Sequence, residues 1–132
     1  MRNHSLLAIA LAGCISLPAI AQNYPAKPIR LMVGFAPGGG TDIVARVLAQ
    51  KLSETWGQQV VVENRAGATG TIAADFVAKS APDGYTLLMG HVNSNAIAPT
   101  LFKKLPYDAV KDFASITYVG YVPNVLTVHP SL

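Results

Sequence analysis

Between Ile29 and Phe102 the sequence repeats one pattern three times. Each repeat has a short apolar run of the kind that forms a buried β-strand, then a loop of small and polar residues, then a segment with helical periodicity. The apolar runs cover residues 29–35, 60–62 and 86–89. Because strands that alternate with helices pair in parallel through right-handed crossovers, the sequence predicts an α/β layer with a mostly parallel sheet.

The first helical segment follows a glycine-rich turn at residues 36–40. Apolar residues then recur at intervals of three and four, which is the spacing of one helix face. These residues are Ile43, Val44, Val47, Leu48 and Leu52. Thr41 is the expected N-cap, Asp42 suits the positive end of a helix, and Gly57 suits its C-terminal end. We therefore expect a helix between Thr41 and Gly57 that packs this apolar face against the sheet.

The second and third units are shorter. The second helical segment has an apolar stripe and ends at a turn over residues 81–84. That stripe consists of Ile72, Ala73, Phe76 and Val77. Residues 96–102 are expected to form a short helix after the third strand, bent or capped around Pro99. Beyond a polar connection, residues 113–121 and 125–128 are expected to be extended.

Residues 1–21 differ from the rest of the chain in composition. The whole sequence is 51% hydrophobic, and this segment alone contains 14 hydrophobic residues. Arg2, the apolar run Leu6–Ile15 and the sequence Ala19-Ile20-Ala21 are typical of a secretory signal peptide. The apolar run is too short to cross the ~30 Å of a bilayer's hydrocarbon as a permanent helix. We therefore expect residues 1–21 to be removed and the mature protein to work outside the cytoplasm.

An alternative processing site lies within the same segment. Leu11-Ala12-Gly13-Cys14 resembles the bacterial lipobox, in which the cysteine is lipidated and becomes the new N-terminus. Cleavage after Ala21 is favoured because that site lies where the globular pattern begins. Cys14 is the single cysteine of the sequence, which excludes an internal disulfide framework and a thiolate zinc cluster.

Charge and motifs exclude several kinds of function. The formal net charge of +3 at pH 7 is small and comes from scattered residues, so no nucleic-acid partner is expected. The loop at residues 36–42 contains neither the dinucleotide-binding nor the P-loop glycine motif, so no cofactor is expected. His91 alone cannot make a metal site, because such a site usually has three or four ligands.

Three loops are the candidate site for a ligand. In an open parallel sheet, ligands bind beyond the carboxyl ends of the strands. The loops expected there cover residues 36–42, 64–71 and 90–95. Glycines let backbone N–H groups approach a ligand, and helix N-termini attract anions. These loops therefore predict an anion site, most simply for a carboxylate, built from main-chain donors, hydroxyls and amides.

Each of these signals also has a purely structural explanation. The glycines fit a tight turn between a strand and a helix equally well. Asp42 can contact a ligand, although capping of its own helix is favoured. His91 can line a pocket or lie in solvent, and residues 93–95 also suit an ordinary turn.

Several short motifs, in order along the chain, closely resemble the Bug/TctC family. They are Tyr24–Arg30, Phe35–Asp42, Val61–Ala68, Ala81–Leu88, Leu105–Asp108 and Val122–Leu126. Members of this family are the substrate-binding proteins of tripartite tricarboxylate transporters. The resemblance covers essentially all of residues 24–132 and rests on several independent motifs, which makes it specific.

The resemblance implies a two-lobed, hinged periplasmic binding protein of type II that closes on a small carboxylate and performs no chemistry on it. Its implied partners are that ligand (a dicarboxylate, tricarboxylate or amino acid) and a membrane permease of the tripartite tricarboxylate type. The protein itself is expected to be monomeric. In the family, main-chain groups and waters of two strand-to-helix loops hold the ligand carboxylate. Carried over to this sequence, with the third loop as a further wall, the site residues are Phe35, Pro37, Gly38, Gly39, Gly40, Thr41, Asp42, Gly67, Ala68, Gly70, Thr71, His91, Asn93 and Ser94.

The sequence departs from the family in three respects. Gly34 stands where proline is common, and Thr69 stands where glycine is often found, which can alter donor geometry in the second loop. Family members are also much longer, so residues 22–132 are expected to form most of the first lobe, with the chain truncated before the second lobe. Because the cleft lies between the lobes, we expect weak or undetectable ligand binding by this chain alone.

Two other interpretations remain open. An extracytoplasmic hydrolase would use the glycine loop as an oxyanion hole, with Ser94 and His91 as nucleophile and base. No G-x-S-x-G sequence surrounds these two residues. A truncated gene would instead leave a non-functional remnant of a binding protein.

Overall fold

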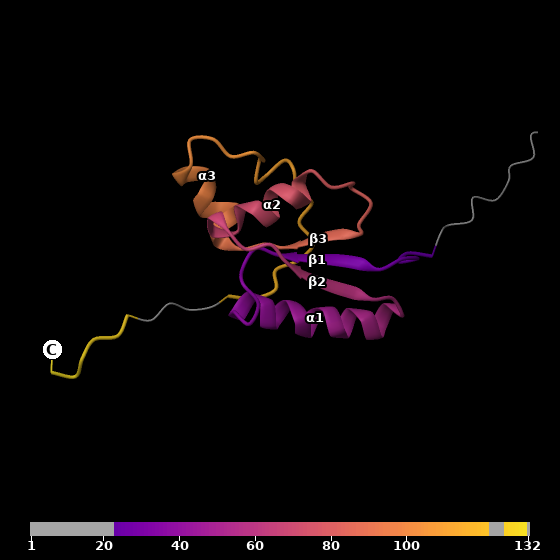
Figure 1. Cartoon of the computed structure of the whole chain (residues 1–132), viewed down its shortest axis with the longest axis horizontal. Helices are drawn as coiled ribbons and strands as arrows, with labels where there is room; N and C mark the ends of the chain where they lie inside the picture. Colours follow the sequence, from indigo (N-terminus) through magenta and orange to yellow (C-terminus); the bar gives the residue numbers. More distant parts are fainter. Residues whose placement is uncertain (1–22, 122–125, 132) are drawn as a thin grey trace, which may run out of the picture.

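Three parallel β-strands form the centre of the structure (Figure 1). They are β1 (Ile29–Val33), β2 (Val60–Asn64) and β3 (Thr86–Met89), and β1 lies between the other two. The computed structural model describes residues 23–121 and 126–131. Both strand pairs run parallel, so the predicted α/β fold with a parallel sheet is confirmed.

Helices cover both faces of this sheet (Figure 1). α1 (Gly40–Trp56) packs against one face, chiefly over β2 and β1, and α2 (Thr71–Ala78) packs against the other. A short 3₁₀ turn, η1 (Ala68–Gly70), leads into α2. The strand–loop–helix order predicted from the sequence is therefore present twice in full.

The third helical segment is short and irregular. A π-helical turn, η2 (Asn93–Ile97), runs directly into α3 (Ala98–Leu101). The helix predicted over residues 96–102 thus exists but begins earlier, and Pro99 lies in the first turn of α3 as a proline can. Among the described residues, no helix is both long and apolar enough to cross a bilayer.

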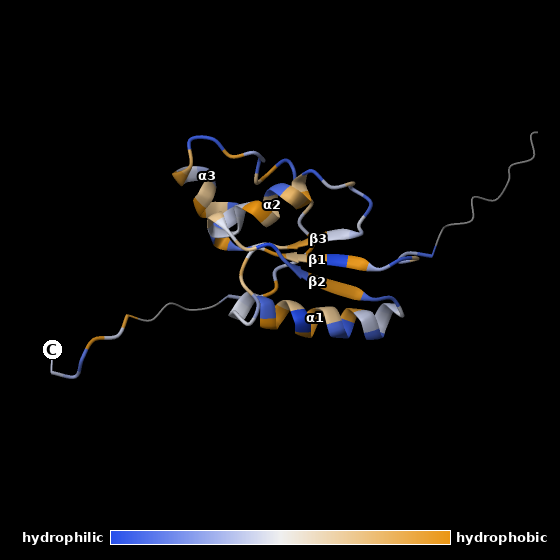
Figure 2. Ribbon diagram, in the orientation of Figure 1, coloured by the Kyte–Doolittle hydropathy of each residue, from blue (hydrophilic) through white to orange (hydrophobic). Residues whose placement is uncertain are grey.

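The main core lies between α1 and the sheet. Ile29, Leu31 and Val33 alternate along β1 and point to this face, where they are buried with Ala45 and Ala49 of α1. Figure 2 shows the mainly hydrophobic colouring of β2 beside the mixed colouring of α1. The two alanines have small side chains, so the backbone of α1 can approach the sheet closely.

The buried face of α1 differs from the predicted one. The sequence predicts that Ile43, Val44 and Val47 face the sheet, but they are 55%, 43% and 58% exposed. Ala45 and Ala49 are buried instead. The prediction was wrong for these three residues, whereas Leu48 and Leu52, which were predicted for the same face, pack against the core. It failed because apolar residues occupy two faces of this helix, and hydrophobic periodicity alone does not show that the smaller alanines allow the closer packing.

The two ends of α1 lie at glycines. Its N-cap is Gly39 and not the predicted Thr41, because the carbonyl of Gly39 already accepts the N–H of Ile43 at 3.0 Å. The helix therefore begins with a backbone turn, without a side-chain cap. Gly57 ends the helix as predicted: its φ of 65° suits glycine, and its N–H donates to Ser53 O at 3.0 Å.

The predicted extended segments near the end of the chain are not strands. In the described part of the chain no strand pairs with residues 113–121, and a strand requires a neighbour for its hydrogen bonds. Residues 116–119 instead line an apolar pocket of 410 Å³ together with side chains of β1, β3 and α1. Residues 126–128 are not in a strand either. Val125, together with the predicted signal peptide at residues 1–21, lies outside the described residues.

Candidate functional site

The three loops that follow the strands meet at one edge of the sheet. A Cβ atom on Gly34 would lie 2.7 Å from the Cα atom of Gly70, so the first two loops are in direct backbone contact. A Cβ atom on Gly70 would lie 3.5 Å from the Phe35 ring and 3.5 Å from Ser94 Cβ. The loops therefore join through Phe35, Gly70 and Ser94, as expected where parallel strands end together.

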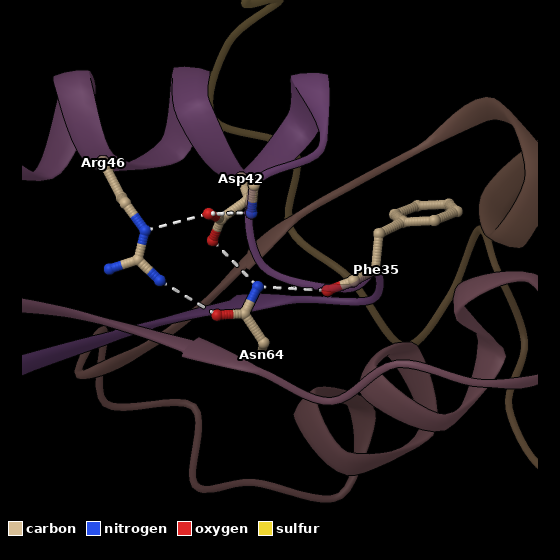
Figure 3. Close-up of polar contacts among 5 residues, drawn as sticks. Phe35, Asp42, Arg46 and Asn64 are labelled. Atoms are coloured by element: carbon tan, nitrogen blue, oxygen red, sulfur yellow. Dashed lines mark hydrogen bonds and ion pairs between the residues drawn. The ribbon is translucent and has the colours of Figure 1, made fainter.

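Asp42 holds the first loop in place (Figure 3). Its carboxylate is almost completely buried. Oδ2 accepts the backbone N–H of Gly38 at 2.8 Å and Nε–H of Arg46 at 2.9 Å, and Oδ1 accepts the amide N–H of Asn64 at 2.8 Å. These hydrogen bonds, that from Arg46 foremost, hold the pKa of Asp42 well below its usual range. The carboxylate is therefore charged, and both of its oxygens are engaged within the protein.

Asn64 connects this carboxylate to the first and second strands (Figure 3). Its side-chain amide also donates to the carbonyl of Phe35 at 3.0 Å, and its Oδ1 accepts Nη2–H of Arg46 at 3.1 Å. Asn64 is the last residue of β2. Asp42, Arg46 and Asn64 thus form a closed ring of contacts, which we call the Asp42 brace, between the first loop, α1 and β2.

The brace decides between the two expectations for Asp42. Both oxygens of its carboxylate accept hydrogen bonds from protein donors, which supports the favoured capping role, although Gly39 is the N-cap itself. Arg46 was not singled out from the sequence, and Asn64 was included only as the first residue of the second loop. An arginine four residues after an aspartate is a local signal of a helical ion pair, but the contact with Asn64 spans 22 residues and depends on how the sheet assembles.

The exposed rim of the first loop contains three glycines, and the turn requires only one of them. Gly38 has a φ of 84°, which favours glycine. Gly39 has a φ of −76°, which any residue adopts. A Cβ atom on Gly40 would meet no atom within 4 Å. The explanation of these glycines as a tight turn therefore accounts for Gly38 and leaves Gly39 and Gly40 without a structural requirement.

The second loop is a turn of left-handed backbone. The φ angles of Gly67, Ala68, Thr69 and Gly70 are all positive, at 135°, 44°, 57° and 92°. Gly70 N–H donates to Gly67 O at 2.9 Å, and the hydroxyl of Thr71 donates to Ala68 O at 2.8 Å. A β-branched residue rarely adopts this conformation, so Thr69 is strained. The departure from glycine at Thr69 therefore has a structural consequence.

The third loop places an imidazole against the first loop. The rings of His91 and Phe35 meet edge to face with their centroids 4.6 Å apart. Nδ1 of His91 accepts the backbone N–H of Asn93 at 3.2 Å. Ser94 is 2% exposed, and its carbonyl accepts the hydroxyl of Tyr107 at 2.6 Å. This loop is thus fixed from both sides, by Phe35 and by Tyr107.

Ser94 and His91 do not form a nucleophile–base pair. The Ser94 hydroxyl lies 3.2 Å from the main-chain oxygen of His91 and 2.7 Å from Oδ1 of Asn95, and it donates to these and not to the imidazole. Within residues 23–121 and 126–131, no group of three or more His, Cys, Asp or Glu side chains is placed to hold a metal ion.

The structure thus sorts the residues predicted for the site. Those that meet where the loops join are Phe35, Gly70, His91 and Ser94. Pro37, Gly38, Gly39, Gly40 and Thr41 lie along the first loop and the start of α1, and Gly67, Ala68 and Thr71 belong to the second loop. Asp42 and Ser94 direct their polar atoms into the protein, whereas Asn93 begins η2 beside His91.

Comparison with known proteins identifies the family. Residues 44–132 match the family described as "Tripartite tricarboxylate transporter family receptor", or TctC. Protein BugT of Bordetella pertussis is 49% identical over 125 residues, which make up 94% of this chain and 38% of BugT. The chain therefore spans well under half the length of this relative.

Two solved structures share the fold. The periplasmic binding protein BugD superposes with a TM-score of 0.65 at 46% identity, over 68% of this chain and 30% of BugD. MatC from Rhodopseudomonas palustris, with bound malate, gives a TM-score of 0.65 at 46% identity, over 68% of this chain and 31% of MatC.

These matches confirm the resemblance seen in the motifs. They also confirm the fold as one part of a periplasmic binding protein. The family consists of receptors and binding proteins and not of enzymes, so the hydrolase alternative is set aside. The chain belongs to the TctC family of tripartite tricarboxylate transporter receptors.

Proposed function

We propose that the three loops form one wall of a carboxylate site in a periplasmic solute-binding protein that serves a tripartite tricarboxylate-type transporter. The observation that supports this best is the junction of Phe35, Gly70 and Ser94 at the carboxyl edge of the sheet. In MatC, which shares this fold, the bound molecule is malate, a dicarboxylate. A small organic carboxylate is therefore the ligand class that we assign to these loops.

The donors for such a ligand would come mainly from the backbone. α1 begins at Gly40 and α2 begins at Thr71, both at this edge of the sheet, although the N–H of Thr71 itself donates to Ala68 O. The first N–H groups of a helix have no acceptor within the helix, and the helix dipole favours an anion there. The charge of Asp42 would oppose an anion, but its ion pair with Arg46 at 2.9 Å offsets that charge.

The glycines of the first loop support the same assignment. Gly39 and Gly40 are exposed and have no conformational need for glycine. The absence of side chains at these positions lets a ligand approach the backbone directly. The N–H of Gly40 has no acceptor among the described residues, whereas that of Gly39 donates to Ala36 O at 3.4 Å. A ligand that contacts the main chain would explain why glycine stands at both positions, whereas the geometry of the turn does not require it.

A titration followed by amide NMR tests this site. The chain would be expressed, purified after export and titrated with malate, with the neutral diamide of malic acid as the control ligand. We expect malate to shift the amide resonances of Gly40 and Thr41 at the start of α1, whereas those of Lys51 and Glu54 near the other end of α1 stay unchanged. Equal shifts with the diamide, or shifts confined to other parts of the chain, would contradict a carboxylate site.

Export is the second part of the proposal. Residues 1–21 would direct the protein to the periplasm and be removed after Ala21. The intact mass of the exported protein tests this, with a chain that begins at Gln22 as the expected result. A mass that includes a diacylglyceryl group on Cys14 would show lipoprotein processing instead.

A further inference from the structure

We propose that Nε2–H of His91 donates a hydrogen bond to the ligand carboxylate and makes His91 a specificity-determining residue; this rests on the carboxylate site proposed above. The imidazole lies where the loops meet. Its ring contacts the Phe35 ring edge to face, and the Phe35 ring lies beside Gly70 of the second loop. His91 is only partly buried, and its contact with Phe35 places the imidazole beside the junction of the three loops.

The contact with Asn93 sets the position of the proton. Nδ1 of His91 accepts the backbone N–H of Asn93, and a nitrogen that accepts a hydrogen bond carries no proton. A neutral imidazole has one proton on its two nitrogens, so this proton must be on Nε2. Nε2 donates to none of the described residues, whereas Nδ1 is fully used by the turn.

Three other polar side chains of the loops, those of Ser94, Thr71 and Asp42, make their hydrogen bonds within the protein. The hydroxyl of Ser94 donates within its own turn, and that of Thr71 donates to Ala68 O. The carboxylate of Asp42 is held in the brace. His91 differs from these three residues because its turn contact leaves a donor free, and a hydrogen bond from N–H to a carboxylate is stronger than one between neutral groups.

Two substitutions separate the two nitrogens of His91. The amide of glutamine can reach the place of Nε2, whereas the shorter asparagine reaches only the place of Nδ1. His91→Gln keeps the proposed donor and loses the turn acceptor, and His91→Asn does the opposite. Malate affinity of the exported chain, measured by NMR titration, should fall about tenfold to a hundredfold in His91→Asn, which is the loss of one hydrogen bond to a charged group. His91→Gln should lower it by less than about threefold.

The chain offers a matched control at His129. Nδ1 of His129 also accepts the backbone N–H of the residue two positions later, Ser131, at 3.2 Å. His129→Asn should therefore leave malate affinity unchanged. The thermal midpoint of each variant would be measured alongside, so that a loss of folding is recognised.

The outcomes distinguish this inference from the proposed function. If the chain shows no malate-dependent shift in its loops even when it is joined to the part of MatC that follows the matched region, the carboxylate site itself fails. If the wild type binds and the two His91 variants lose affinity equally, or His91→Gln loses more, the donor role of Nε2 is overturned. Nitrogen-15 spectra of the free chain give a test without ligand: we expect the proton on Nε2, and a proton mainly on Nδ1 would overturn the inference.

Discussion

Asp42 links three parts of the candidate site through one buried carboxylate. It accepts hydrogen bonds from Gly38 in the first loop, from Arg46 on α1 and from Asn64 at the end of β2. A buried acceptor that loses its donors costs more than the mean value of a hydrogen bond. The Asp42 brace should therefore stabilise the fold and also hold the loop that we propose to bind the ligand.

Replacement of Asp42 by asparagine tests the brace. Asp42→Asn keeps the shape of the side chain, removes its charge and turns one acceptor into a donor that faces other donors. We expect the free energy of unfolding to fall by about 1–3 kcal/mol, measured by urea unfolding. Glu54→Gln breaks the exposed ion pair with Lys51 on the same helix, and it should change the value by less than about 1 kcal/mol. If the two variants lower the free energy of unfolding equally, the Asp42 brace does not have the stabilising role that we infer.

The same carboxylate predicts a loss of stability in acid. Its pKa is lowered in the folded protein from the ordinary 3.8, chiefly by the hydrogen bond from Arg46. A carboxyl group with a lowered folded pKa stabilises the protein above its unfolded pKa, and this contribution is lost as the pH falls toward the folded pKa. The free energy of unfolding should therefore decrease below about pH 4, and less steeply in Asp42→Asn. If the free energy of unfolding falls equally with pH in the wild type and in Asp42→Asn, Asp42 does not contribute to the acid sensitivity.

Thr69 holds a backbone conformation that its own side chain disfavours. Its φ of 57° and ψ of 27° lie in the left-handed region. Thr69→Gly should raise the free energy of unfolding by about 1 kcal/mol, because glycine adopts this region without strain. Gly57→Ala provides the reverse case: its φ is 65° and its new Cβ would meet no atom within 4 Å, so its effect is conformational alone and should be destabilising. The Thr69 hydroxyl donates to Ala68 O at 2.6 Å, and a loss of stability in Thr69→Gly would show that this hydrogen bond outweighs the strain.

At the scale of the elements, the sequence predicted the location of the segments better than the faces they bury. The strands, the loops and the stop at Gly57 carry local signals, since apolar runs, glycines and prolines act over a few residues. The face of α1 and the state of residues 113–121 depend on distant partners. A strand requires another strand beside it, and no local pattern supplies that information.

The candidate site was also predictable only in part. That the loops would meet follows from a parallel sheet, which places the carboxyl ends of its strands at one edge. The brace depends on register: Val33 pairs with Asn64, and this brings the Asn64 amide to the carbonyl of Phe35. A one-residue change in register would turn Asn64 to the other face of the sheet. The sequence alone does not specify this pairing, and so it could not reveal the role of Asn64.

A pair of substitutions on α1 tests which of its faces is buried. Ala45 is completely buried against the sheet, whereas Val47 is 58% exposed. Ala45→Leu should lower the free energy of unfolding by about 1–3 kcal/mol through overpacking. Val47→Ala should change it by no more than about 0.5 kcal/mol. Urea unfolding of both variants gives the comparison, and a larger effect at Val47 would favour the face that the hydrophobic periodicity predicts.

At the scale of the whole molecule, the loops that we propose to bind a ligand lie on one side of the site. Gly39, Gly40, Gly70 and His91 all belong to the same edge of one sheet. Small-molecule sites usually bury most of the ligand surface, which strengthens polar contacts by excluding water. The chain matches only 31% of MatC, in which malate is bound. Contacts from this edge alone should therefore orient a carboxylate without enclosing it.

A chimera with MatC tests whether incomplete enclosure of the ligand limits malate binding by this chain. The present chain would be joined to the part of MatC that follows the matched region, and malate binding would be measured by calorimetry. We expect the chimera to bind malate at least about a hundredfold more tightly than the exported chain does, which corresponds to about 2.7 kcal/mol. The chimera and the exported chain contain the same three loops. The difference between their affinities for malate would therefore measure the contribution of the added part. Micromolar binding by the 132-residue chain itself would contradict this account, since it would show that one wall is sufficient.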